Sequence, residues 1–142
     1  MRFSKIDLQC EDIVWFGVDK NECIFACTSG GMGNVPEFVC KSKEETERLR
    51  IFFTDLLPTK TEGRLLIHEE NTLLCQDGMK LAKKGLYCFD VSDDGDAYVK
   101  ISEPRVPLKI FELPQKIQKL MNKHFVNINA GERNIFSVEH AY

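Results

Sequence analysis

The sequence predicts a single α+β domain over residues 1–142, in which a mainly antiparallel sheet packs against two or three helices. Two pairs of apolar runs, 12–29 and 86–102, each enclose a short polar turn. Strands joined by short turns pair antiparallel, so these runs predict the sheet. An amphipathic segment over 43–57 predicts the helix that covers it, and a chain of 142 residues fits one domain.

The first strand pair consists of "DIVWFGV" (12–18) and "CIFACTS" (23–29), with Asp19–Glu22 as the turn. Aspartate and asparagine favour such turns because their side chains bond to nearby backbone N–H groups. Apolar side chains alternate onto both faces of the first strand, which predicts burial on both sides. One face carries Ile13 and Trp15, and the other carries Val14, Phe16 and Val18.

The segment 43–57 begins with a capping-box spacing, Ser42 and Glu45, and ends before Pro58. Its apolar residues recur with helical spacing and predict one buried stripe. The stripe consists of Leu49, Phe52, Phe53 and Leu56. With the strands and the last helix, it defines the expected core: Trp15, Phe16, Phe25, Leu49, Phe52, Phe53, Leu56, Phe89 and Leu120.

Later elements have weaker signals. Within the unclear segment 59–84, "GRLLIHEENTLLC" (63–75) fits a strand or a helix. Asp77-Gly78 fits a turn or the cap of a helix, and a short helix over about 78–84, followed by Gly85, is the favoured prediction. "LYCFDVS" (86–92) and "AYVKIS" (97–102) form the second hairpin. The prolines near 106–113 indicate an edge strand or an extended connector.

Pro114 opens a helix, because a missing N–H costs nothing at that position. Ile117, Leu120, Met121 and His124 form the apolar stripe of this helix. A last hairpin is expected around Ala130-Gly131.

The charge and hydropathy exclude several classes of protein. The net charge of −3 argues against a nucleic-acid binder, which usually has a basic excess. No run of 18 apolar residues occurs and the first residues lack a signal-peptide core, so we expect a cytoplasmic chain with no membrane contact. The six cysteines are then expected to be free thiols packed as small hydrophobic residues: Cys10, Cys23, Cys27, Cys40, Cys75 and Cys88.

The glycine cluster at 30–36 raises the question of a phosphate site. It begins like a dinucleotide fingerprint, but Pro36 replaces the third glycine and the expected helix begins only after Ser42. Loop geometry is the better interpretation, and no cofactor is predicted.

Neither metal binding nor catalysis has a motif here. The chain has no C-x-x-C pair, and His68, His124 and His140 are far apart in sequence. The acidic 93–96 segment does not match a calcium loop, because its glycine comes third. No catalytic or metal-binding residue is predicted, although a cysteine nucleophile with a histidine base needs only spatial proximity and stays an open alternative.

The N-terminal half resembles a group of small, poorly characterised bacterial proteins with a W-F-x-x-D hairpin, then T-S-x-G and a G-x-x-P step. "KKGLYCFDVSD" and "YVKISEPRVPLKIFELP" also resemble that group, and together these segments cover about half the chain. The resemblance implies a non-enzymatic binding role, as an immunity-like protein that binds a toxin of a polymorphic toxin system. The cysteine content departs from the group. The matching positions are Trp15, Phe16, Asp19, Thr28, Ser29, Gly31, Gly33 and Pro36.

Two functional hypotheses follow. The first is a protein-interaction domain that uses exposed loops, since loops on a rigid scaffold are common recognition sites. The alternative is a small-molecule-binding or enzymatic domain with a pocket beside the Gly30–Pro36 loop. The candidate interaction residues are Gly31, Met32, Gly33, Asn34, Glu37, Asp93, Asp94 and Asp96.

Overall fold

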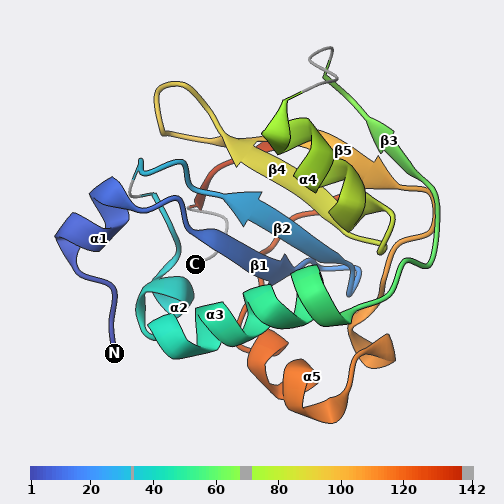
Figure 1. Cartoon of the computed structure of the whole chain (residues 1–142), viewed down its shortest axis with the longest axis horizontal. Coiled ribbons are helices and arrows are strands. Elements are labelled where there is room, and N and C mark those ends of the chain that lie inside the picture. The colour runs from blue at the N-terminus through green and yellow to red at the C-terminus, as the bar shows by residue number, and fades with distance from the viewer. Residues whose placement is uncertain (33, 68–71, 139–142) are drawn as a thin grey trace.

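The structure is a computed structural model that describes residues 1–32, 34–67 and 72–138 (Figure 1). It confirms the predicted α+β domain with a mostly antiparallel sheet. The sheet has the order β1-β2-β4-β5-β3, and β6 also pairs with β5. The strands are β1 (Val14–Val18), β2 (Ile24–Thr28), β3 (Gly63–Leu65), β4 (Tyr87–Val91), β5 (Tyr98–Pro104) and β6 (Ile135–Phe136).

Both predicted hairpins are present, and their connection gives the sheet its mixed character. β1 pairs with β2 and β4 with β5, antiparallel in each case. β2 and β4 lie side by side and run parallel, which the sequence analysis did not anticipate. A parallel pair needs a long crossover, and here it contains most of the helical layer.

The helices cover one face of the sheet more fully than the other. In Figure 1, α3 lies along β1, with α5 beyond it, while α4 lies over β4 and β5. The helices are α1 (Lys5–Cys10), α2 (Glu37–Cys40), α3 (Lys43–Ile51), α4 (Leu73–Ala82) and α5 (Gln115–Met121), with a π-helix over Phe52–Leu56 and a 3-10 turn over Ile110–Glu112.

Each face of the sheet has its own hydrophobic cluster. Ile13 and Trp15 belong to the cluster that packs against segment 126–138, and Phe16 and Val18 belong to the cluster beneath α3 and α5. The predicted alternation of the first strand is therefore confirmed, and β1 is buried on both sides.

The predicted stripe of 43–57 is only partly correct. Leu49 and Phe53 are buried, but Phe52 is half-buried and Leu56 is 67% exposed. The reason is the π-helix, in which the Leu57 N–H donates to the Phe52 carbonyl, five residues back, at 2.8 Å. The wider turn rotates later residues away from the 3.6-residue stripe, so Leu56 faces solvent.

The ambiguous segment 59–84 contains both a strand and a helix. β3 occupies its start, and α4 begins at Leu73 instead of 78. The Thr72 hydroxyl accepts the Cys75 N–H at 3.2 Å and caps α4, a signal that the prediction missed. Residues 68–71 lie outside the described part of the chain.

Of the two alternatives for segment 106–113, the structure shows the connector and not the edge strand: the segment ends in a 3-10 turn, and Pro114 precedes α5 as predicted. The expected hairpin around Ala130-Gly131 is wrong. The Val126 N–H donates to the Val18 carbonyl at 2.9 Å, and β6 pairs with β5, so the two arms bond to different strands.

Candidate functional site at the carboxyl ends of β2 and β4

The parallel pairing of β2 and β4 places their carboxyl ends at one edge of the sheet. Thr28 lies opposite Asp90 in the register, and its hydroxyl donates to the Asp90 carboxylate at 2.5 Å. The chain leaves each strand there, through the loop 29–36 and the turn 92–97. In sheets with parallel strands, ligands bind at this edge because the loops converge on it.

The structure joins the two segments that the sequence analysis predicted separately. The Asn34 side-chain amide donates to the Gly95 carbonyl at 2.6 Å. A Cβ on Gly95 would lie 2.9 Å from the Met32 Cε, so the Met32 side chain packs against the turn. The Tyr98 hydroxyl donates to the Asn34 carbonyl at 2.7 Å. We call the surface formed by Met32, Asn34 and residues 93–96 the loop-edge surface.

The loop-edge surface is held rigidly from below. Tyr98 is fully buried, and its hydroxyl accepts a hydrogen bond from the Trp15 indole N–H at 3.1 Å. The indole and the Tyr98 ring pack edge to face, with centroids 5.5 Å apart. Tyr98 therefore ties Asn34, which sits on the loop, directly to the aromatic core.

Carboxylates dominate this surface. Asp93, Asp94 and Asp96 are all exposed. The Ser92 hydroxyl and the Asp96 N–H donate to Asp94, and these bonds lower the pKa of the Asp94 carboxyl. Burial raises the pKa of Asp90, and the charges of Asp12 and Asp93 add to that effect. Asp12 and Asp93 lie close enough to Asp90 to act on it, so several negative charges lie together at this edge of the sheet.

The remaining predicted interaction residues are not part of the loop-edge surface. Glu37 forms a bidentate ion pair with Arg2, at 2.5 and 2.8 Å, on the first turn of α2. Gly30 and Gly31 both have positive φ, 58° and 73°, which only glycine adopts readily. The glycine cluster thus serves backbone geometry in this region. Gly33 lies outside the described residues.

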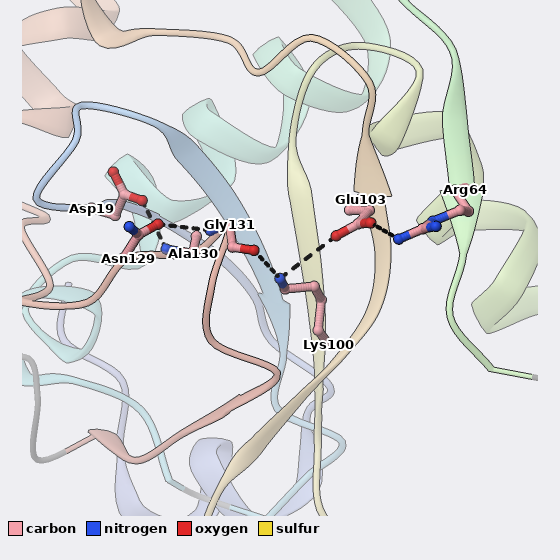
Figure 2. A network of polar contacts seen from close by, with 7 residues as sticks. All are labelled: Asp19, Arg64, Lys100, Glu103, Asn129, Ala130 and Gly131. Carbon is pink, nitrogen blue, oxygen red and sulfur yellow. Dashed lines mark hydrogen bonds and ion pairs between the residues drawn. The ribbon is translucent and has the colours of Figure 1, made fainter.

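A buried lysine network is the polar feature that the sequence analysis missed (Figure 2). The β4–β5 register shifts by one residue, because Phe89 faces Lys100 while Cys88 faces Ser102. This bulge brings Lys100 and Glu103, three residues apart, onto the same face. The Lys100 ammonium lies 3.7 Å from the Glu103 carboxylate and 3.3 Å from the Gly131 carbonyl.

Lys100 is 3% exposed, and its ammonium lies over the rings of Tyr87 and Phe89, 5.2 and 5.9 Å from their centroids. Burial lowers the pKa of Lys100. Arg64 binds the other side of Glu103. An inward lysine between Tyr98 and Ile101 in "YVKIS" was the available sequence signal. Its burial and its contacts with two aromatic rings indicate that Lys100 is part of the structural core.

The histidine and cysteine side chains that the structure describes form no reactive pair. His124 is 2% exposed, and its Nδ1 donates to the Phe16 carbonyl at 2.8 Å. Burial lowers its pKa, so the neutral imidazole is favoured. Five cysteines are buried, but Cys10 is exposed, contrary to expectation. Within 1–32, 34–67 and 72–138, no group of three His, Cys, Asp or Glu side chains is placed to hold a metal ion; His68 and His140 lie outside these ranges.

Two of the cavities that the described residues form lie on the α3 side of the sheet. The first, about 340 Å³, lies between α3 with its π-helix on one side and α4 on the other. The second, about 370 Å³, lies between α3 and the segment before β1. Neither is lined by residues 30–32 or 34–36, so neither is the pocket predicted beside the Gly30–Pro36 loop.

Comparison of the chain with protein-family models, curated proteins and solved structures gave no match. Among the helices in the described ranges, none combines the length and the apolar character needed to cross a bilayer.

Proposed function

We propose that this chain is a non-enzymatic protein-binding domain whose loop-edge surface docks onto a basic partner protein. The observation that supports it is the bond between Asn34 and Gly95, which makes one continuous surface from two distant segments. A docking surface needs a fixed shape, and the Trp15–Tyr98–Asn34 chain of bonds supplies it.

The surface combines an exposed apolar side chain with several carboxylates. Met32 is 44% exposed, and its flexible thioether adapts to the shape of a partner. The exposed carboxylates of Asp93, Asp94 and Asp96 belong to the turn that Met32 packs against, and they add negative charge beside it. Such charges favour a partner with lysines and arginines, and they act mainly on the rate of association.

The resemblance to immunity-like proteins suggests the identity of that partner. We propose that it is a basic toxin, whose binding by this chain masks the toxin. Nuclease toxins carry positive surfaces that bind phosphate backbones, and an acidic protein surface competes for the same charges.

The experiment uses toxins encoded beside the gene for this chain as purified probes. Association and dissociation rates would be measured for the parent and for the triple variant Asp93→Asn/Asp94→Asn/Asp96→Asn across a salt series. We expect the triple variant to associate about tenfold more slowly at low salt and nearly equally at high salt, because salt screens the lost attraction. Met32→Ala should mainly accelerate dissociation.

A control variant removes the same number of charges elsewhere. Asp55→Asn/Glu62→Gln/Glu132→Gln alters exposed residues of the π-helix, the segment before β3 and the turn after Asn129. It should associate as the parent does, apart from a small change due to net charge. Equal slowing in both triple variants would refute the loop-edge surface as the docking site. Failure of every such toxin to bind at micromolar concentration would refute the toxin-binding role.

A further inference from the structure

A hollow remains open between the two helices that cover the same face of the sheet. Figure 1 shows β2 passing between α3 and α4, and the first cavity lies there. Small side chains form its floor, notably Ala26 of β2 and Cys88 of β4. Leu74, Leu81 and Ile101 add apolar walls. A larger residue at position 26 would fill this space, so its small side chain keeps the cavity open.

α4 cannot move into the cavity because hydrogen bonds and a close contact hold it against the sheet. The Gly78 carbonyl accepts the Ser102 hydroxyl at 2.9 Å and the Cys88 thiol at 3.6 Å. A Cβ at Gly78 would lie 3.0 Å from the Ile101 Cδ1, so helix and strand are already in close contact there. The cavity therefore persists as a preformed site, the usual property of small-molecule pockets.

Positive charge gathers at one end of the cavity. The Lys84 ammonium donates to the Phe53 and Thr54 carbonyls at 2.9 and 2.5 Å. These two bonds leave one of its three protons for a ligand. Lys80, which also lines the cavity, has no carboxylate within ion-pair distance in the described part of the chain. Two further charged residues line it: Asp77, three residues before Lys80 on α4, and Arg50, which pairs with Glu47 and also lines the second cavity with Asp12.

The end of the cavity opposite Lys84 lies near the carboxyl end of β2. Lys84 precedes β4, whose first residue, Tyr87, pairs with Phe25 near the start of β2, whereas Thr28 ends β2. Three residues of strand separate these positions, about 10 Å. Thr28 and Asp12 line that far end, where the Asp12 carboxylate accepts the Gly30 N–H at 2.7 Å. An anion is therefore favoured near Lys84, whereas at the far end the charges of Asp12 and Arg50 oppose each other.

We propose that this cavity binds a straight-chain aliphatic monocarboxylate of about 8 to 12 carbons, with its head group at Lys80 and Lys84 and its chain over Ala26. The size follows from volume. An apolar cavity of about 150 Å³ holds benzene, with its six carbons, so this cavity holds about 13 non-hydrogen atoms. The site is separate from the loop-edge surface and does not depend on the proposed partner.

The test uses decanoate as the probe, below its micelle concentration, with titration calorimetry for affinity. Methyl NMR shifts locate the ligand, and the Ala26, Leu81 and Ile101 methyls should move most. Decanol and decylamine share the chain length but lack the carboxylate. We expect one-to-one decanoate binding, at least tenfold weaker binding of decanol and no saturable binding of decylamine, because only a carboxylate pairs with both lysines.

Variants separate the charge from the cavity. Lys80→Gln/Lys84→Gln should weaken decanoate binding at least tenfold while leaving decanol unchanged. Lys83→Gln is the matched control, since Lys83 is an exposed lysine at the end of α4 that does not line the cavity, and it should bind within about twofold of the parent. Ala26→Val should weaken decanoate and decanol alike. Lys80→Gln alone leaves the Lys84 hydrogen bonds intact, so it tests the charge if the double variant unfolds.

Three results would overturn the proposal. These are no saturable decanoate binding up to its solubility limit, equal affinity for all three probes, and equal affinities of the Lys83 variant and the variants at Lys80 and Lys84.

Discussion

Phe53→Ala should be among the most destabilising single substitutions in this chain. Phe53 is fully buried, and its ring lies 4.6 Å from that of Phe16 and 5.1 Å from that of Phe52, measured between centroids. Truncation of a buried phenylalanine costs about 3–5 kcal/mol, from lost burial and from the cavity left behind. That is a large share of the roughly 5–15 kcal/mol that stabilises a domain.

Leu56→Ala is the matched control for this prediction. Both residues lie in the π-helix and both belong to the apolar stripe seen in sequence, but Leu56 is 67% exposed. An exposed side chain away from special features changes stability by about 0.5 kcal/mol or less. The two substitutions should therefore differ by at least about 2.5 kcal/mol, because the π turn buries one residue and exposes the other.

Urea unfolding, followed by the fluorescence of the single tryptophan, Trp15, measures the difference. With a slope of about 2 kcal/mol per molar urea, Phe53→Ala should lower the unfolding midpoint by about 1.5–2.5 M. Leu56→Ala should lower it by about 0.25 M or less. Equal midpoint shifts for the two variants would show that the helical stripe continues without a π turn and would refute this reasoning.

Three further predictions concern titratable groups. Burial lowers the folded-state pKa of Lys100, so its charge destabilises the fold at neutral pH, and this penalty fades as pH rises toward 10.5. In urea titrations, Lys100→Met should be at least as stable as the parent at pH 7 and lose that advantage as pH approaches 10.5. Burial also lowers the folded-state pKa of His124, so below pH 6.5 the unfolded chain binds a proton at this histidine more readily than the folded chain does, and stability falls. His124→Gln should therefore lose less stability than the parent between pH 7 and 5. Cys10 is the one exposed thiol, so native protein should show one thiol that reacts fast with a colorimetric disulfide reagent, and Cys10→Ser should remove that reaction. Fast labelling of several thiols would contradict the buried positions of the other five cysteines.

Local signals carried most of the correct fold predictions. Asp19 bonds to the N–H groups of Asn21 and Cys23, as expected of a turn aspartate, and Ser42 caps α3 through the Glu45 N–H. The parallel β2–β4 pairing depends on contacts between residues about 60 positions apart, which no local pattern encodes. The π turn at Phe52–Leu56 was likewise missed, because it departs from the 3.6-residue period on which the prediction relied.

The candidate site shows the same division. Composition alone pointed to Met32, Asn34 and the 93–96 turn as loop residues. The hydrogen bond from Asn34 to Gly95 that joins the two segments depends on the order of strands in the sheet. The first cavity was beyond sequence analysis for a similar reason. Its walls come from α3 and α4, and it stays open because the close contact of Gly78 with β5 keeps α4 from moving into it.

The strand order also determines how long each strand waits for its neighbour while the chain is synthesised on the ribosome. The first hairpin is bordered on one edge by β4 and on the other by 124–126, since Val18 bonds to His124 and Val126. At synthesis rates of about 5–20 residues per second, the hairpin waits roughly 5–20 s between its own emergence and that of residue 126. Both outer edges of the hairpin are open until β4 emerges, and the β1 edge stays open until residue 126 emerges; open edges of apolar strands favour aggregation. Stalled chains that end at residue 104 should therefore recruit chaperones more strongly than stalled chains in which residue 138 has emerged, and equal recruitment would contradict this order of assembly.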